Sequence, residues 1–417
     1  MAKSIEANSD DIRNHKVLTQ AMGLLDLDVV RQEWDDAEEI LFLFCTPRWA
    51  VDVCPECGHL TGLIHDYPEQ RHIHDLPLRG VKTMLVFDVH RLRCKHCRHV
   101  FTLRIRDVVA DCTYSQRLAR EISDPTRKQD VETLSRLYRI GYKTVESILL
   151  KASEAKIAER QKAPLLVKQL GIDEQSNRKG QGNYILVITD LERRIVLDIL
   201  SDRQKATLIE WLEKPPAGID LAQLEAVATD LWGHYRDAVS AVFGDKVKIV
   251  ADRFHVMQNL HEAIHATRRE AQQQADNEEE RKRLKGLRYI LLKKDEKLTE
   301  SDKKRLDELK DCHPQLYQLT RLRQQLYQWY EADYSVEEAT KELNRWLEKA
   351  ETIASKSLQV FCQTLRNWQQ EITNFFSHRI TSGFVEGMNN KIRVIKRIAF
   401  GLPSFAHFRA RILWACG

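Results

Sequence analysis

The sequence lacks any apolar run long enough to cross a bilayer. Its 417 residues contain short apolar stretches such as ILFLFC at 40–45, whereas a membrane helix needs about 20 consecutive apolar residues. The N-terminal segment MAKSIEANSDD also lacks the apolar core of a secretory signal. We therefore expect a cytoplasmic protein of bacterial origin with no membrane partner. The chain is too long for one compact core, which predicts two to four domains.

The sequence lacks an even number of cysteines: with nine, they cannot all pair in disulfides within one chain. Four of them form two CxxC pairs, Cys54 with Cys57 and Cys94 with Cys97, and in a cytosolic chain this spacing favours metal. Two such turns can complete a tetrahedral zinc site. Alternating runs beside them, MLVFDVHRL and HVFTLRI, predict short strands. We therefore predict a zinc-ribbon-like module with structural Zn²⁺ on the four cysteines. Alternative ligands are His59, His65, His96 and His99.

A large net charge is also lacking, since the formal value is only +4. The distribution is nevertheless uneven. Residues 1–90 carry 8 basic and 16 acidic side chains, residues 91–160 carry 16 and 9, and residues 387–417 carry six and none. Two separate basic segments favour contact with a polyanion at two places, although ordinary charged helix surface is the alternative.

A pair of helices is predicted after the cysteine pairs. Apolar residues recur at helical spacing in VETLSRL and again in VESILL, and Gly141 lies between them in YRIGYKT. A helix, a turn containing glycine and a second helix are typical of a DNA-binding helix-turn-helix, although any small helical hairpin shares this pattern. The predicted DNA-contacting side chains are Lys143, Thr144, Ser147 and Lys151.

Strand character begins near residue 170. Strands are predicted at 170–173, 183–189, 195–200 and, in VKIVAD, up to Asp252, with helical pattern in KATLIEWL and from 221 to 243. Three strands in a meander, a helix and a further strand match the front half of an RNase H-like fold. The first and fourth strands are neighbours in that fold. Acids at their ends, Asp173 and Asp252, are therefore expected to meet across a cleft.

The segment from 254 to 376 is highly charged and helical in pattern, which predicts a helical insertion within a catalytic fold; a free-standing bundle is the alternative. QLYQLTRLRQQLYQWY repeats leucines along one face, and Ser335 with Glu338 form a capping box. RYILLKKDEKL reads equally as a strand or a helix. Trp329 and Trp346 are interpreted as buried side chains or, alternatively, as contacts to distorted bases.

Three acids are candidates for metal-dependent chemistry. Mg²⁺ and Mn²⁺ prefer hard oxygen ligands, and two such ions about 4 Å apart can activate one oxygen and stabilise another in phosphoryl transfer. We predict two ions on Asp173, Asp252 and Glu386, the last on a helix from residue 382 or 383. Asp230 is the main rival, and His255 and Asn390 are supporting candidates, with Asn389 sharing the same helix face as an alternative. Phosphate-binding candidates on this helix are Lys391, Arg393, Lys396 and Arg397.

Four blocks resemble bacterial insertion-sequence transposases of the ISL-three family. These blocks are GIDEQSNRKGQ, TDLWGHYRDAV, VADRFHVMQNL and SGFVEGMNNKIRVIKRIAFG. The CPEC and CKHC pairs and the predicted helix-turn-helix extend the resemblance over nearly the whole chain. It implies a DDE transposase with an RNase H-like catalytic fold. By this resemblance Asp173 and Asp252 are the two aspartates and Glu386 is the glutamate, with the insertion between the second and third acids.

The predicted architecture is therefore a multidomain α+β protein, with an RNase H-like mixed sheet and a large helical insertion. The expected parts are a zinc-ribbon-like region over 1–106, a helix-turn-helix domain over 107–165, the first part of the catalytic core over 166–260, the insertion over 261–375, and C-terminal helices completing the core over 376–417.

The predicted activity joins DNA binding to phosphoryl transfer. Such a protein would bind the terminal inverted repeats of its element, cut at the element's end by hydrolysis, and use the exposed 3′-hydroxyl to attack target DNA. Because two ends are joined, we expect a homodimer or larger assembly that associates with the nucleoid when bound to DNA. The alternatives are a non-catalytic zinc-containing regulator, a structure-specific nuclease and an assembly protein with no DNA role.

Overall fold

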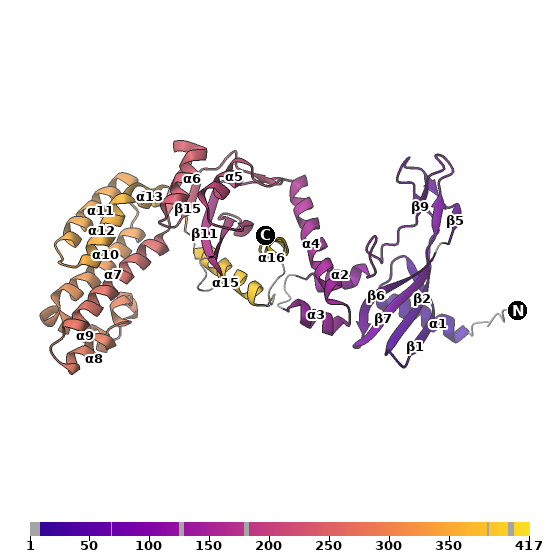
Figure 1. Cartoon of the computed structure of the whole chain (residues 1–417), viewed down its shortest axis with the longest axis horizontal. Helices are drawn as coiled ribbons and strands as arrows, with labels where there is room; N and C mark the ends of the chain where they lie inside the picture. Colours follow the sequence, from indigo (N-terminus) through magenta and orange to yellow (C-terminus); the bar gives the residue numbers. More distant parts are fainter. Residues whose placement is uncertain (1–8, 68, 125–128, 179–182, 382, 399–403) are drawn as a thin grey trace. The chain divides into compact units, whose positions relative to one another are not determined.

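The computed structural model describes residues 9–417 except 68, 125–128, 179–182, 382 and 399–403. It contains both helices and sheets (Figure 1), and its Cα positions separate into two compact units. The first unit comprises Met1–Ala155 and Ile395–Ala415, and the second comprises Lys156–Val394 and Cys416–Gly417. No helix in the described part of the chain is long and apolar enough to cross a membrane.

The first unit begins with a helix against a mixed four-stranded sheet. Helix α1 spans Ser9–Met22, and the strands, in the sheet order β1-β2-β7-β6, span Leu27–Asp35, Ile40–Pro47, Val81–Asp88 and Gln70–Leu78. Alternate residues of these strands form its core, in which Leu27, Leu43 and Ile73 are fully buried.

Short strands surround the two cysteine pairs. They are β3 (Asp52–Val53), β4 (Leu60–Thr61), β5 (Ile64–Asp66), β8 (Arg91–Arg93) and β9 (Val100–Thr102). Strands β3 and β4 pair across the first cysteine turn, and β8 and β9 pair across the second. The prediction of short strands beside these turns is confirmed.

Three helices follow, α2 (Gln116–Ile122), α3 (Val131–Tyr138) and α4 (Tyr142–Lys162). Asp130 caps α3 by accepting a hydrogen bond from the backbone N–H of Thr133. Arg139 ends α3 in the left-handed conformation, with φ of 51°, so the chain turns there and Gly141 follows without a positive φ. The two predicted helices and the turn between them are confirmed.

The last helix, α16 (Phe405–Cys416), bonds to these helices. The Ser153 hydroxyl donates to the Ala410 carbonyl at 2.8 Å, and His407 Nδ1 lies 3.0 Å from Glu146 Oε1. Residues 395–415 accordingly cluster with the first unit. We expected all of 376–417 to complete the catalytic core, but α16 groups with the first unit instead. Its side chains also donate to the backbone carbonyls of Ser123 and Gln129 in that unit.

The second unit is built on a five-stranded sheet in the order β13-β12-β11-β15-β16. Its strands, in that order, span Ile195–Leu200, Asn183–Asp190, Gln169–Arg178, Ala226–Thr229 and Lys248–Ala251. The first three are antiparallel, whereas β11, β15 and β16 run parallel. A separate parallel pair joins β10 (Leu165–Leu166) to β14 (Ile219–Asp220).

Three predictions for this sheet are wrong. The segment 221–243 is not one helical stretch, because Ala226–Thr229 forms β15 and only Gly233–Phe243 forms α6. The strand before Asp252 is therefore the fifth, and it pairs with β15 rather than with β11. All four residues of β15 are buried, so this short strand has no exposed face to give the alternation that marks a strand. Strand β11 also continues past Asp173 because β12 pairs with it as far as Arg178.

Helices cover both faces of this sheet. Helices α5 (Lys205–Glu213) and α6 pack on the face that contains Val227. Ala226 and Ala228 point the other way and pack into the helical block of residues 253–378. The short 3₁₀ turn η1 spans Gly244–Lys246.

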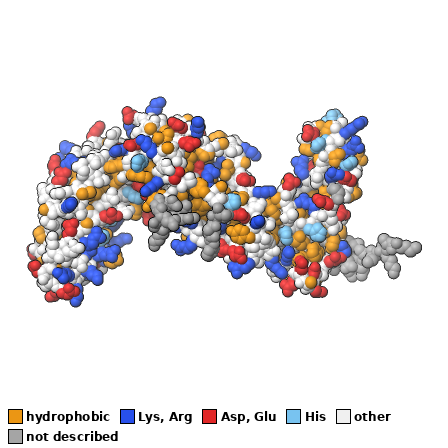
Figure 2. Space-filling view, viewed as in Figure 1, with side chains coloured by type: hydrophobic (Ala, Val, Ile, Leu, Met, Phe, Trp, Pro, Cys, Tyr) orange, Lys and Arg blue, Asp and Glu red, His pale blue; other side chains and the backbone are white. Residues whose placement is uncertain are grey.

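The helical block is coloured orange in Figure 1. Its elements are α7 (Arg253–Gln274), α8 (Glu278–Gly286), η2 (Ile290–Leu292), η3 (Asp295–Lys297), α9 (Glu300–Cys312), α10 (Pro314–Glu331), α11 (Val336–Glu351), α12 (Lys356–Asn367), α13 (Gln369–Thr373) and α14 (Phe375–His378). Helix α7 runs across the expected insertion boundary at 260. RYILLKKDEKL is neither a strand nor an α-helix, since it contains the two 3₁₀ turns. Red and blue side chains both occur over α8 and α9 (Figure 2).

Details of this block confirm several predictions. The leucine face of α10 is buried, and Ser335 and Glu338 form the capping box of α11. Trp329 and Trp346 are only 6% and 5% exposed. Their ring N–H groups donate to the carbonyls of Ala339 and Leu322. Both tryptophans are therefore structural, and the alternative of base contacts is excluded by their burial.

Candidate active site and zinc site

The two cysteine turns have the same backbone construction. In the first, Cys54 N–H donates to the His59 carbonyl, and Gly58 N–H donates to the Cys54 carbonyl. In the second, Cys94 N–H donates to the His99 carbonyl, and Arg98 N–H donates to Cys94. Gly58 and Arg98 occupy the equivalent left-handed position, with φ of 73° and 63°. Glycine adopts this conformation without strain, whereas Arg98 adopts it at a cost of about 1–2 kcal/mol.

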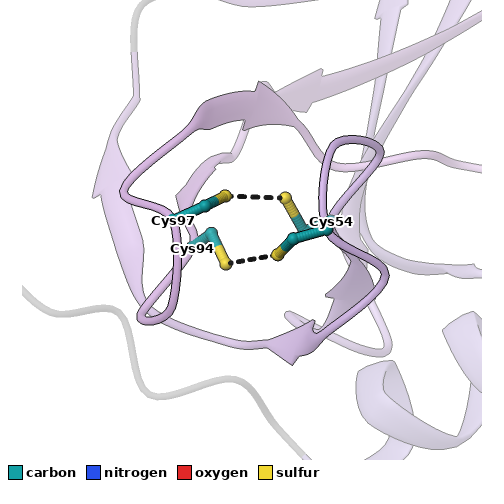
Figure 3. Close-up of side chains that lie close together, drawn as sticks. Cys54, Cys94 and Cys97 are labelled. Atoms are coloured by element: carbon teal, nitrogen blue, oxygen red, sulfur yellow. Dashed lines mark hydrogen bonds between the residues drawn. The ribbon is translucent and has the colours of Figure 1, made fainter.

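The four thiols converge between these turns (Figure 3). Cys54 Sγ lies 3.5 Å from Cys97 Sγ, and Cys57 Sγ lies 3.5 Å from Cys94 Sγ. All four sulfur atoms lie within 4.8 Å of one another. A tetrahedral zinc with Zn–S bonds of about 2.3 Å needs sulfur separations of about 3.8 Å, so the four cysteines fit this ion.

Two further features bear on zinc at these turns. Hydrogen bonding, first from the Cys97 backbone, lowers the pKa of Cys94, whereas desolvation and the neighbouring thiols raise the pKa of Cys57 and Cys97. Four thiols this close cannot all ionise without a cation between them, and a bound zinc supplies one. Of the alternative ligands, His59 and His96 form a second group with Cys57, but their rings stack on each other at 4.0 Å. The four-cysteine set therefore needs no histidine.

Three acids lie in register where the parallel pairing of β11, β15 and β16 ends. Asp230 and Asp252 directly follow β15 and β16, whereas β11 itself continues past Asp173 to Arg178. Ile172 of β11 pairs with Thr229 of β15, and Thr229 pairs with Ala251 of β16. The next residues along these strands are Asp173, Asp230 and Asp252. Adjacent strands are about 4.8 Å apart, so Asp230 is one strand spacing from each of the other two, and Asp173 and Asp252 are two spacings apart.

His255 lies between the two outer acids. Its Nε2 is 4.0 Å from Asp173 Oδ1 and 3.8 Å from Asp252 Oδ2. Asp252 is the N-cap of α7, and its Oδ1 accepts a hydrogen bond from the backbone N–H of Phe254 at 3.2 Å. The first turn of α7 therefore brings His255 next to two of the candidate metal ligands. A supporting role for His255 remains a prediction.

Burial changes the acidity of this cluster. It raises the pKa of Asp173, with repulsion from Asp252 adding to the effect and His255 opposing it. Burial likewise raises the pKa of Asp230 to about 7. Asp230 Oδ1 is buried without a hydrogen-bond partner among the described residues. Two carboxylates held in this way gain from a bound cation, because the cation offsets both desolvation and repulsion.

Helix α15 (Gly383–Ile398) contributes an amide to the site. Asn389 is 4% exposed and donates from Nδ2 to Asp173 Oδ2 at 2.7 Å. Gln175 Nε2 donates to the Asn389 backbone carbonyl at 3.3 Å. Asn390 is exposed, and its Oδ1 accepts from Arg393. The structure therefore places Asn389 against Asp173, and the prediction of Asn390 in that position is corrected, because consecutive helical residues point about 100° apart.

Glu386 lies one turn before Asn389 on α15 and is exposed. The exposed face of the helix carries Glu386, Asn390, Arg393 and Arg397, and the buried face carries Val385, Asn389 and Ile392. Among the described residues, the groups with three or more ligand atoms within 4.8 Å of one another contain only cysteines and histidines of the zinc module. Glu386 is therefore on the helix that touches Asp173 without forming a closed three-acid cluster.

Three site residues were placed poorly or missed by sequence reasoning. The sequence favours Asp230 only as a rival, because the pattern over 221–243 predicts a helix where β15 lies. The sequence signal was present, since AVATD and KIVAD both end a short apolar run with aspartate. Gln175 and the choice of Asn389 over Asn390 had no local signal, because both depend on how α15 rotates against β11.

Two protein-family models match this chain. A family model described as a transposase, of the DDE type found in ISL3 elements, matches residues 170–412. A second model, the zinc-finger of transposases IS204, IS1001, IS1096 and IS1165, matches residues 50–97.

Two curated relatives carry related names. The transposase for insertion sequence element IS1001 of Bordetella parapertussis is 28% identical over 403 residues, covering 96% of this chain and 97% of that protein. The transposase for IS1557 of Mycobacterium tuberculosis is 27% identical over 290 residues, or 64% of each chain. With its catalytic-domain match over more than half its length and its zinc-finger match before that, this chain belongs to the ISL3 family of DDE insertion-sequence transposases.

Proposed function

We propose that the second unit is an RNase H-like phosphoryl-transfer domain whose metal-binding carboxylates are Asp173, Asp252 and Glu386, with Asp230 between the first two. The observation that carries this proposal is the register of the three aspartates, each of which follows the last residue in the parallel pairing of β11, β15 and β16. Composition alone would not favour these positions, since the chain holds 61 acidic residues.

The sheet order supports the RNase H-like assignment. In that fold the first and fourth strands are neighbours, and here β11 and β15 are the first and fourth strands of the sheet and pair in parallel. The acids that belong to this neighbouring pair are Asp173 and Asp230. The strand order therefore supports Asp230 as a metal ligand more strongly than the sequence alone does.

The donor set suits Mg²⁺ or Mn²⁺, because carboxylate and amide oxygens are hard ligands. A pair of such ions would supply an activated water and stabilise the leaving oxygen. Asp173, Asp230 and Asp252 would hold the ions, and Glu386, on the same helix as Asn389, would complete the set. Asn389 orients Asp173 through its hydrogen bond. His255 keeps the outer carboxylates at a fixed separation.

The first unit supplies modules for binding the element's ends. Helices α3 and α4 have the order and turn of a helix-turn-helix. Lys143 and Lys151 are exposed on α4, and Thr144 and Ser147 are half-buried. Lys151 Nζ also bonds to Cys112 Sγ at 2.9 Å. We infer that this helix and the zinc ribbon contact terminal repeats. We also infer that four basic residues of α15 hold phosphates: Lys391, Arg393, Lys396 and Arg397.

Transposition requires two element ends, which supports assembly as a homodimer or larger oligomer on DNA. The proposed reaction starts with hydrolysis at the end of the element and exposes a 3′-hydroxyl. That hydroxyl then attacks a target phosphodiester, forming one bond as another breaks. The same carboxylate site serves both steps, so no side-chain nucleophile is needed.

A strand-transfer assay tests the proposal. The full chain is incubated with Mg²⁺, pre-cut element ends and a plasmid target. Joined products are expected with the unaltered protein and not with Asp252→Ala, while both bind the ends equally in a gel-shift assay. If the unaltered protein cleaves uncut element ends but gives no joined product from pre-cut ends, a nuclease is supported instead. Normal joining by Asp252→Ala would remove Asp252 from the site.

A further inference from the structure

Phe254 is an exposed aromatic side chain at the start of α7, between two residues of the candidate site. It is 48% exposed, although a phenylalanine gains free energy from burial. The other large hydrophobic side chains exposed in the described part of the second unit are Tyr289, Val360 and Val394. Only Phe254 lies next in sequence to the acids at the sheet end.

The backbone at Phe254 is held on both sides. Its own N–H donates to Asp252 Oδ1. The preceding residue, Arg253, donates to Glu331 at 2.5 Å and lies over the Tyr330 ring at 5.1 Å. The following residue, His255, lies between Asp173 and Asp252. Because the Phe254 N–H is bonded and both neighbours contact other elements, the backbone that carries the Phe254 ring is held at the site.

The ring is also oriented relative to the site. It meets the His255 imidazole edge-to-face, with ring centroids 5.6 Å apart and planes at 87°. The same imidazole reaches the two outer carboxylates with its Nε2. A phosphate held at those carboxylates would therefore place its own nucleotide, or the next one, within reach of Phe254.

We propose that Phe254 is a nucleobase-binding platform, on which the base next to the scissile phosphate stacks. The inference rests on the proposed carboxylate site. Aromatic side chains stack on bases of any identity, and each such contact is strong enough to hold a base out of the helix. The buried Trp329 and Trp346 cannot serve this purpose. A single ring beside a phosphate site fits one base and is too small to dock a protein.

A substrate cycle tests this proposal in the full chain. Duplexes carrying an element end are made with a single abasic nucleotide at each position on either side of the mapped cut. On the intact duplex, Phe254→Leu should lower the cleavage rate at least about fivefold, the lower limit for loss of one stacked base. On the duplex abasic at the stacked position, the two proteins should cleave equally. Phe254→Trp, which retains a ring, should cleave the intact duplex at close to the normal rate.

Controls separate stacking from folding and from chemistry. Tyr289→Leu alters another exposed aromatic of the same unit and should show the same rate as the unaltered protein on every duplex. The proposal is overturned if Phe254→Leu lowers the cleavage rate by the same factor on all duplexes, or does not lower it on any duplex. A 2-aminopurine at the stacked position, read without divalent metal, should brighten when Phe254→Leu replaces the unaltered protein. That signal is independent of cleavage, so normal cleavage by Asp173→Asn would refute the carboxylate site without refuting the platform.

Discussion

In the zinc ribbon, four ligands come from two turns of the chain, and each turn supplies two cysteines separated by two residues. The candidate active site instead takes one acid from each of three strands and one more from α15, beyond a helical block of more than a hundred residues. The first site depends on short-range backbone geometry within its own module. The second exists only after the sheet of the second unit has formed. Substitutions at one site should therefore leave the structure of the other site unchanged.

The largest expected effect comes from the active site. Asp173→Asn should reduce Mg²⁺-dependent cleavage of an element end by about 1000-fold or more, because it removes a charged ligand while keeping the side chain's shape. Binding of the end, measured by gel shift, should change less than about twofold.

Asp237→Asn is the matched control, since Asp237 is an exposed acid on α6. It should cleave normally. Equal losses with both variants would mean that the effect is not specific to the strand ends.

Loss of zinc should be the next largest effect. Cys94→Ser should reduce bound zinc from one ion per chain to none, because structural zinc sites need their full ligand set. We expect end binding to weaken about 100-fold, while the unfolding transition of the second unit keeps its midpoint. Metal analysis, gel shift and calorimetry measure the three quantities.

Cys312→Ser provides the comparison, since Cys312 is an exposed, unpaired cysteine on α9. It should retain both zinc and end binding. If Cys94→Ser shifts the midpoint of the unfolding transition of the second unit, the two sites are coupled.

A smaller effect is expected from the amide that orients Asp173. Asn389→Ala should lower cleavage about 10- to 100-fold, the usual range for a residue that positions a metal ligand. The apparent affinity for Mg²⁺, read from the metal dependence of the rate, should weaken as well. Asn390→Ala should change neither quantity by more than about twofold, because its side chain is exposed and faces Arg393. Similar losses in both variants would contradict the orientation of α15.

The smallest effect concerns pH. The folded-state pKa of Asp230 is about 7, above its ordinary value of 3.8, so the folded state binds this proton more tightly than the unfolded state. Its contribution to stability is therefore present at low pH and is lost as pH rises through about 7. The asparagine of Asp230→Asn cannot ionise. Without added Mg²⁺, the free energy of unfolding of this variant should therefore fall less between pH 5 and pH 8 than that of the unaltered protein. The expected difference is about 1–2 kcal/mol after allowance for partial exposure. Denaturant unfolding at both pH values measures this difference, and parallel pH curves for the two proteins would refute the raised pKa.

Local patterns predicted several elements because their causes are local. Three of these features follow from spacing and capping within a few residues: the cysteine turns, the capping box of α11 and the buried leucine face of α10. Strands β12 and β13 follow from runs rich in β-branched residues on either side of the turn DLERR. Strand β15 was missed because all four of its residues are buried and small or branched. Its strand character comes from the two strands that enclose it, which no window of sequence contains.

For this protein, the sequence by itself determined the zinc ligands, the family and the acids worth considering, because each depends on residue type and short spacing. Only the tertiary structure decided that Asp230 stands between Asp173 and Asp252, that Asn389 rather than Asn390 faces Asp173, and that α16 joins the first unit. Those outcomes depend on strand order, register and helix rotation. Such features are set by packing between segments that are far apart along the chain.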